Sequence, residues 1–447
     1  MLRLARLHWT VGLGVGLIVA PFAVVPALGC GLGAVLVWRR GPRPRALAGA
    51  VVIGVDARRR AVAIPLGGES GSHTLIVGAT GSGKTVSETL IVCRAIESGL
   101  GAVIVDPKGD PLLRERVQAA AERAGRQFLE WTPSGPCAYN PYGHGSAGEI
   151  ADKALAGERF TEPHYLRQAQ RYVAHAVRAL HGAGEVATPA RLVALLEPRR
   201  LELLARSVPD EAHARRLFEY LDSLDARQRS GLTGTRDRLA ILAESEIGGW
   251  LEPSDGVPAL DLLDAVRSRS VSYFRLESDR LPLLSRMLAA AVVGDLLTVA
   301  ASCQSAPVGT LVAIDEFSAI APEGVARLFG RARSAGFSLL LATQELADLR
   351  AAAPELLEQV LGNVEAVVAH RQSVPDSAEM IARIAGTRPV WSSTEQLTHA
   401  VPNGRSSRSR SREFAIHPDA IRTLARGCAA VSVPGAGRCA LARIFHP

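Results

Sequence analysis

Short, mostly apolar runs alternate with longer segments whose apolar residues recur at helical spacing, from residue 73 to the end of the chain. Continuous apolar runs of this kind are typical of parallel strands that are buried on both faces. The alternation therefore predicts an α/β fold built on a largely parallel sheet. The predicted strands are 74–77, 101–106, 127–132, 270–276, 311–316, 337–344 and 362–371.

Further strands are predicted at both ends of this pattern. They are 51–56 with 60–65, as a small hairpin, and 429–433 with 438–444, which close the sheet. A long apolar helix is predicted at 283–301. Arg286 and Asp295 interrupt it, so we expect a buried core helix and not a membrane span.

Residues 1–46 differ in kind from the rest of the chain. No charged side chain occurs between Trp9 and Trp38, and arginines flank this stretch on both sides. Such a length exceeds the roughly 20 residues that span a bilayer, which predicts a membrane anchor. Pro21 and Pro26 leave two forms open, one long kinked or tilted helix or a tight hairpin. The arginines after Trp38 place the following residues in the cytoplasm.

Residues 143–267 are rich in Ala, Leu, Arg and Glu and contain few β-branched runs. Apolar residues recur at helical spacing in 165–180 and 190–204. This pattern predicts an all-α domain inserted into the α/β core. The core would then consist of two parts, residues 47–142 and 268–447.

Composition narrows the function only slightly. The chain has 447 residues and a net charge of +7, which is compatible with nucleic acid or anionic lipid as a partner and diagnostic of neither. Its six cysteines and eleven histidines show no metal-ligand spacing, so we expect reduced thiols and no structural metal.

The stretch from His73 to Thr85 predicts a phosphate-binding loop. It has the pattern G-x-x-x-x-G-K-[ST] between an apolar strand and an amphipathic helix. Its glycines let backbone N–H groups turn toward a polyphosphate, Lys84 would reach the β- and γ-phosphates, and Thr85 would bind Mg²⁺ through its hydroxyl. The predicted nucleotide-binding residues are Gly78, Ala79, Thr80, Gly81, Ser82, Gly83, Lys84 and Thr85.

A second strand supplies the acids that an NTPase needs. The run Leu311-Val-Ala-Ile-Asp-Glu316 would deliver Asp315 to Mg²⁺ and Glu316 to a water aligned on the γ-phosphate. A base beside the metal ligand favours hydrolysis over mere binding, so ATP and Mg²⁺ are the expected cofactors. The turn Asp106-Pro-Lys-Gly-Asp110 follows another strand at the same edge, and either a functional role or plain turn chemistry remains open for it.

These residues resemble the coupling proteins of type IV secretion, which are membrane-anchored, RecA-like hexameric ATPases of bacterial conjugation. The resemblance runs from His73 to the C-terminus. Besides the phosphate loop, it is carried by Val105-Asp-Pro-Lys-Gly-Asp110, Trp131-Thr-Pro, Tyr139-Asn-Pro, Ile314-Asp-Glu, Gly330-Arg-Ala-Arg-Ser-Ala-Gly336, Ala342-Thr-Gln344 and residues 371–386.

The resemblance implies further roles. Arg333 is the best match to an arginine that one subunit extends to the γ-phosphate held by its neighbour, and Arg371 would face the same boundary. Gln344 would contact the γ-phosphate or orient water, although it could instead simply cap the next helix. From Arg405 to Arg412 arginine alternates largely with serine; this is either a solvated loop or, inside a ring, a contact to a DNA backbone.

The sequence therefore predicts a RecA-like P-loop ATPase with an inserted all-α domain, anchored in the bacterial inner membrane with its ATPase in the cytoplasm. As a homo-hexamer it would drive DNA, single-stranded with a relaxase, into a type IV secretion channel. The alternatives are a protein-export ATPase, a non-catalytic substrate receptor or a septal-type duplex DNA translocase.

Overall fold

The computed structural model describes residues 49–67, 71–157, 162–398 and 401–447, which belong to one compact unit. The anchor predicted for residues 1–46 lies outside the described residues.

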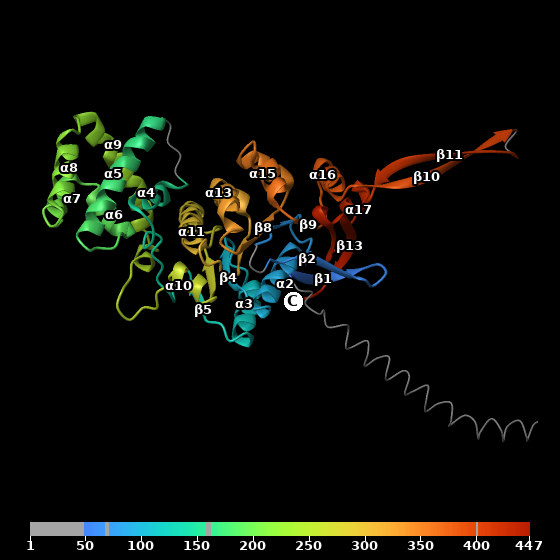
Figure 1. Cartoon of the computed structure of the whole chain (residues 1–447), viewed down its shortest axis with the longest axis horizontal. Helices are drawn as coiled ribbons and strands as arrows, with labels where there is room; N and C mark the ends of the chain where they lie inside the picture. The colour runs from blue at the N-terminus through green and yellow to red at the C-terminus, as the bar shows by residue number, and fades with distance from the viewer. Residues whose placement is uncertain (1–48, 68–70, 158–161, 399–400) are drawn as a thin grey trace, which may run out of the picture. The chain divides into compact units, whose positions relative to one another are not determined.

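One 11-stranded sheet forms the centre of the fold (Figure 1). Its parallel strands confirm the predicted α/β class, and their neighbours are far apart in sequence, as crossover connections require. In spatial order these strands are β9 (Ala366–Ala369), β3 (Thr74–Val77), β8 (Phe337–Thr343), β7 (Thr310–Ile314), β4 (Gly101–Asp106), β6 (Val271–Arg275) and β5 (Phe128–Trp131).

An antiparallel extension completes one side of this sheet. It consists of β12 (Cys428–Val433), β13 (Arg438–Ile444), β1 (Ala50–Asp56) and β2 (Ala61–Pro65). The predicted hairpin and the two predicted closing strands are therefore present, and the closing strands also pair with each other. The two pairs of strands meet because β1 pairs with β13, with Val55 opposite Arg443.

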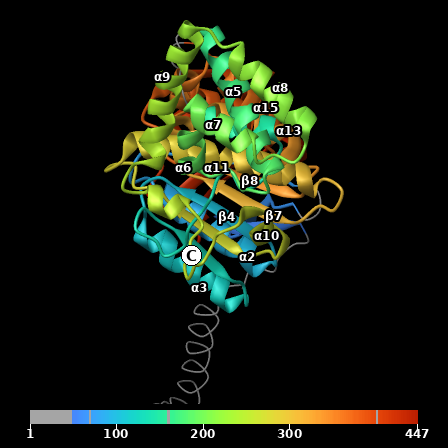
Figure 2. The same cartoon turned by 90° about the vertical axis from the view of Figure 1, so that its left-hand side faces the viewer.

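Helices cover both faces of the sheet, as the two views show (Figures 1 and 2). Along β3, Leu75 and Val77 point to one face and Ile76 to the other, and all three are fully buried. One face packs against α2 (Lys84–Glu97) and α3 (Pro111–Arg123). The other packs against α10 (Leu262–Arg267), α11 (Pro282–Cys303), α13 (Pro322–Ala332), α15 (Leu356–Asn363) and α16 (Pro375–Ala385). Burying one such aliphatic side chain stabilises the fold by about 2 kcal/mol.

The predicted apolar helix is α11, which lies in this core. Among the described residues it is the helix long and apolar enough to cross a membrane, but most of its residues are buried inside the protein. Asp295 is accommodated there because Lys153 pairs with it. The prediction of a buried core helix is thus confirmed.

Between Ala147 and the η1 turn (Gly248–Leu251) the described chain consists of helices and the turns that join them. The helices are α4 (Ala147–Leu155), α5 (Pro163–Gly182), α6 (Pro189–Leu195), α7 (Pro198–Ala205), α8 (Glu211–Asp222) and α9 (Ala226–Ala243). They share a hydrophobic cluster of their own, centred on residues such as Tyr172 and Leu201. The single periodic stretch seen at 190–204 is two helices, since Pro198 begins a new one. That this segment is an independent domain remains a prediction.

The arginine–serine segment is not the loop that its polarity suggests. It belongs to β11 (Val401–Phe414), which pairs with β10 (Thr387–Thr398) in a separate two-stranded sheet. Short polar side chains alternate with arginine at the two-residue period of a strand, but the segment lacks the apolar alternation by which a strand is usually predicted.

Candidate active site

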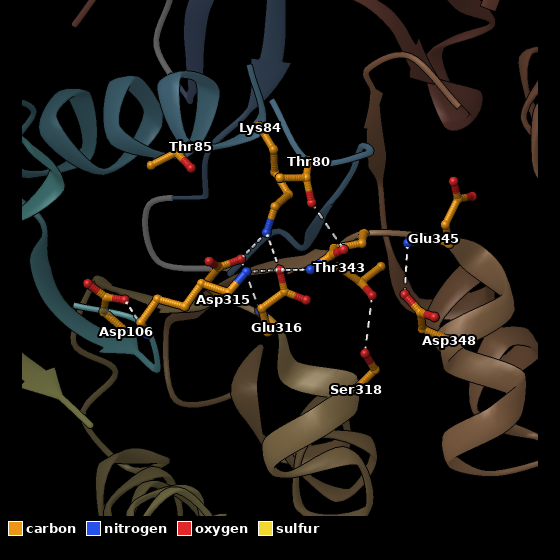
Figure 3. Close-up of polar contacts among 12 residues, drawn as sticks. Thr80, Lys84, Thr85, Asp106, Asp315, Glu316, Ser318, Thr343, Glu345 and Asp348 are labelled. Atoms are coloured by element: carbon orange, nitrogen blue, oxygen red, sulfur yellow. Dashed lines mark hydrogen bonds and ion pairs between the residues drawn. The ribbon is translucent and has the colours of Figure 1, made fainter. Parts of the chain in front are cut away.

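The glycine-rich loop lies where β3 ends and α2 begins, at the carboxyl edge of the parallel strands (Figure 3). Gly83 has φ 111°, a conformation that strongly favours glycine. At Gly78 a Cβ atom would come within 2.7 Å of both the His370 side chain and the Ser82 hydroxyl. The backbone therefore takes a path here that other residues would obstruct.

The loop leaves polar groups that suit an anion. Helix α2 begins at Lys84, and its N-cap residue, Gly83, has no side chain to satisfy the first N–H groups. The Ser82 hydroxyl is buried and has no hydrogen-bond partner among the described residues. Free donors at a helix N-terminus fit a phosphate group, so the residues present fit the predicted nucleotide.

Lys84 joins the loop to the acid strand. Its Nζ forms an ion pair with Asp315 and lies 3.0 Å from Glu316 Oε1 (Figure 3). Lys84 and the acids are separated by more than 200 residues in sequence. The structure therefore brings together three of the residues predicted for catalysis and metal binding.

The charges in this cluster depend on one another. Burial lowers the pKa of Lys84, but Asp315, Glu88 and Glu316 outweigh that effect and hold the pKa above its usual value. Burial raises the pKa of Asp315 despite the nearby ammonium. Burial also acts to raise the pKa of Glu316, but its contacts with Lys84, Gln344 and Lys108 lower it overall, so this side chain is a carboxylate at neutral pH.

Glu316 has a strained backbone. Its φ of 48° places it in the left-handed region, which is uncommon for a residue with a side chain. It precedes the short helix α12 (Phe317–Ile320), where the chain leaves β7. Strain of this kind is retained where surrounding structure requires it, and here it accompanies a carboxylate directed at the loop.

Two further side chains reach Glu316 from neighbouring loops. Gln344 donates from Nε2 to Glu316 Oε1 over 3.1 Å, and its own Oε1 accepts from the Thr80 hydroxyl at 3.3 Å. Lys108 Nζ lies 3.2 Å from the same Glu316 oxygen. Gln344 thus contacts both the loop and the acid, which is more than a capping role requires.

The Asp106–Asp110 turn has both of the roles left open for it, turn chemistry and a contact with the site. Asp106 accepts from the backbone N–H groups of Lys108, Gly109 and Asp110, and Asp110 caps α3, which is turn chemistry. Lys108, however, extends to the site. Sequence reasoning did not single it out, although its position in a turn at the strand edge was a usable signal.

Thr85 lies in the first turn of α2 and has no direct interaction with Asp315 in the described structure (Figure 3). A hydroxyl and a carboxylate are oxygen ligands of the kind that Mg²⁺ prefers. Both residues lie beside Lys84 at this edge of the sheet, which is compatible with the predicted metal site; that site stays a prediction.

Glu88, one turn along α2 from Lys84, was not predicted. It is fully buried, and neither carboxylate oxygen has a hydrogen-bond partner among the described residues. Burial, reinforced by the negative charge of Asp315, raises its pKa well above the usual value. No sequence signal distinguished it from an ordinary solvated helix residue.

His370 supports the loop from behind. Its Nε2 lies 2.8 Å from the Ser87 hydroxyl, and its Nδ1 lies 3.0 Å from the Cys428 carbonyl. Burial lowers its pKa to about 4, so the ring is neutral and can donate from Nδ1 while accepting at Nε2. This residue ties α2 to the closing strands of the sheet.

The structure does not bring Arg333 to the loop of its own chain. Arg333 precedes β8, whose opposite end reaches the site, and it pairs with Glu365 and the Asn363 carbonyl. Arg371 lies closer, since its backbone carbonyl accepts from the Ala79 N–H at 3.2 Å. Only a neighbouring molecule could use Arg333 at a phosphate.

Two family comparisons match this chain. Residues 310–426 match the family described as the TraM recognition site of TraD and TraG. Residues 53–111 match the central domain of the helicase HerA. No curated protein matches the chain.

Solved structures resemble most of its length. The bacterial conjugative coupling protein TrwB lacking its first 70 residues is 18% identical, with a TM-score of 0.61 over 83% of this chain and 84% of that one. TrwB in complex with ADP and Mg²⁺ is 18% identical, with a TM-score of 0.57 over 84% and 86%. VirB4 of Thermoanaerobacter pseudethanolicus is 14% identical, with a TM-score of 0.56 over 90% and 97%.

The ligands of the TrwB complex agree with the predicted cofactors. The loop, the acid strand and the parallel sheet agree with the same fold. The chain therefore has the RecA-like fold of a P-loop ATPase and resembles the coupling ATPases of type IV secretion, as its motifs predict.

Proposed function

We propose that this protein is a membrane-anchored coupling ATPase that uses ATP hydrolysis to drive DNA into a type IV secretion channel. The observation that carries the proposal is the contact of Lys84 with both Asp315 and Glu316 at the glycine-rich loop. A non-catalytic receptor would not need a buried, charged triad of these residue types. The match of residues 310–426 to the TraD and TraG family supports conjugation as the setting.

The loop amides and Lys84 bind the phosphates in this proposal. When bound, Mg²⁺ would neutralise charge on the β- and γ-phosphates, with Thr85 and Asp315 as its protein ligands. Lys84 is held between Asp315 and Glu316 in the structure and would exchange part of that pairing for phosphate oxygens.

Glu316 is the proposed base. It is a carboxylate at neutral pH, and Gln344 and Lys108 fix the position of its Oε1. Gln344 also contacts Thr80 of the loop. Loss of the γ-phosphate would therefore move Gln344 and shift helix α14 (Leu346–Ala352), which follows it. This gives hydrolysis a direct mechanical connection to the adjacent helix.

Assembly completes the site. Because Arg333 is remote from its own loop, it would serve the phosphate of a neighbouring subunit in a hexameric ring. The cargo would be single-stranded DNA delivered with a relaxase, and the residues before the described chain would hold the ring at the inner membrane.

The test is ATP turnover by the full chain in neutral detergent, with no DNA, with single-stranded DNA and with duplex DNA. We expect single-stranded DNA to stimulate turnover and Glu316→Gln to abolish it while leaving nucleotide binding intact. Preferential stimulation by duplex DNA would point to a duplex translocase. Turnover indifferent to both DNAs would contradict the proposal and favour protein cargo.

A further inference from the structure

The hairpin of β10 and β11 has no role in the site described above. Its strands pair with each other over most of their length and, within the described residues, with no strand of the main sheet. In Figure 1 the ribbon extends beyond the helices that cover that sheet. A two-stranded ribbon is only marginally stable by itself.

One face of the hairpin gathers arginines around a tryptophan. Arg408, Arg410 and Arg412 are two residues apart in β11 and therefore share a face. The register places Trp391 directly opposite Arg410 and Pro389 opposite Arg412. Directly opposed residues lie about 5 Å apart at Cβ, so the indole and the guanidinium groups form one surface.

This arginine–tryptophan face is exposed. Trp391 is 65% exposed, which is unusual for a side chain that gains several kcal/mol from burial. Arg408 and Arg410 are exposed and have no hydrogen bond or ion pair with any described residue, whereas Arg412 donates to Thr387 at the base of the hairpin. Residues 387–414 contain five arginines and two glutamates, so the whole hairpin is basic.

Small residues occupy the remaining positions near the tryptophan. Ser393 lies opposite Arg408 on the same face, and Ser392 and Ser409 pair on the reverse face. Serine side chains leave room around the indole, and a serine hydroxyl does not select one base over another. Among the residues described near Trp391, the reverse face is polar apart from Val390, unlike the apolar face with which a surface element enters a bilayer.

We propose that this face binds single-stranded nucleic acid, with Trp391 stacking on a base and Arg408 and Arg410 contacting phosphates. Stacking and phosphate contact together are the chemistry of sequence-independent single-strand binding. A duplex would offer the phosphates but not the base face, so the exposed indole selects the single strand. The proposal rests on the proposed function and identifies where its cargo touches the chain outside the ATPase site.

The test uses the full chain in neutral detergent and a fluorescein-labelled oligothymidylate. Trp391→Ala should weaken binding by roughly tenfold, as expected for one lost stacking contact. Arg408→Ala with Arg410→Ala should make the logarithmic salt slope shallower by about 1.4. Binding should also quench tryptophan fluorescence in the wild type more than in Trp391→Ala. Arg388→Ala is the matched control, because Arg388 lies opposite Glu413 on the reverse face.

Basal ATP turnover without DNA should be unchanged in the Trp391 and Arg408/Arg410 variants, which shows that they fold. Unchanged oligonucleotide affinity in those variants, with wild-type turnover still stimulated by DNA, would overturn the inference and leave the proposed function standing. If the variants bind the oligonucleotide more weakly but wild-type ATP turnover does not respond to DNA, the hairpin binds nucleic acid and the proposed DNA-translocating function is contradicted. The inference would also be overturned if the Trp391 and Arg408/Arg410 variants lost binding to phosphatidylglycerol vesicles but kept their affinity for DNA.

Discussion

At the scale of single residues, the active site is a set of charges placed out of water. Lys84, Asp315 and Glu316 are all largely buried, and the cost of burying these charges is offset because Lys84 pairs with both acids. Glu88 departs from this rule, since it is buried beside the same cluster with no hydrogen-bond partner among the described residues. It is therefore the residue whose charge the fold supports least.

Glu88→Gln should stabilise the nucleotide-free protein. The raised pKa means that the folded state retains a proton that the unfolded chain releases above about pH 4.5, so wild-type stability falls as the pH rises past that value. Glutamine carries no such penalty. We expect a gain of at least about 1 kcal/mol at pH 8 that shrinks toward pH 4.

Urea unfolding of both proteins at pH 4.5, 6 and 8 measures this difference. The exposed Glu115→Gln on α3 is the control and should change stability little at any pH. A Glu88→Gln protein that is less stable than wild type at pH 8 would show that the carboxylate is ionised and satisfied.

At the scale of elements, a buried ion pair joins the helical segment to the core. Lys153 on α4 lies 2.9 Å from Asp295 on α11, and both side chains are at most 2% exposed. Tyr139 donates to the other Asp295 oxygen at 3.0 Å. This network holds α4 against α11, one of the helices that pack on the sheet.

Lys153→Met should destabilise the protein by roughly 3 kcal/mol, because it leaves Asp295 buried without its counter-charge. Lys153→Met with Asp295→Leu should recover most of that loss. The control is Arg383→Met, which removes an exposed pair with Glu379 and should cost less than about 0.5 kcal/mol. Equal losses for the buried and exposed pairs, in chemical denaturation, would contradict this assignment.

Much of the element order could be predicted from sequence. Buried parallel strands are continuous apolar runs, and the strands containing Val77 and Ile314 were predicted within a residue or two of their observed ends. The β10–β11 hairpin could not be predicted in this way, because a ribbon with little apolar surface has no hydrophobic period to detect.

The site was predictable only where a local motif exists. Lys84 lies in the glycine-rich loop motif and Glu316 at the end of an apolar strand, and both patterns can be read from sequence. Lys108, in contrast, is identified by its contact with Glu316, a residue 208 positions away. His370 depends likewise on Ser87, which lies 283 positions away. Contacts of this kind follow from the strand order of the sheet, and a single sequence does not reveal that order.

At the scale of the whole molecule, Arg333 lies away from the loop of its own chain, so its proposed role requires a neighbouring subunit. If a neighbour supplies this arginine, Lys84→Ala and Arg333→Ala should each abolish turnover, yet a mixture of the two proteins should be active. In the mixture some boundaries combine the intact loop of one variant with the intact arginine of the other. Up to about one quarter of boundaries would be complete if subunits mix at random.

ATP turnover of the mixture, against each variant alone at the same total concentration, measures this effect. Arg331→Ala, in the last turn of α13 two residues before Arg333, is the matched control and should retain activity. A mixture no more active than its components, at concentrations where rings form, would exclude Arg333 as the shared residue and direct attention to Arg371.

In the proposed function, ATP hydrolysis moves DNA. The most direct measurement is ATP-dependent displacement of streptavidin from the end of a biotinylated single strand by the full chain, with free biotin as a trap. We predict displacement from one end in preference to the other, lost with Glu316→Gln and with a non-hydrolysable ATP analogue. Vigorous ATP turnover without displacement from either end of single-stranded or duplex DNA would contradict the claim.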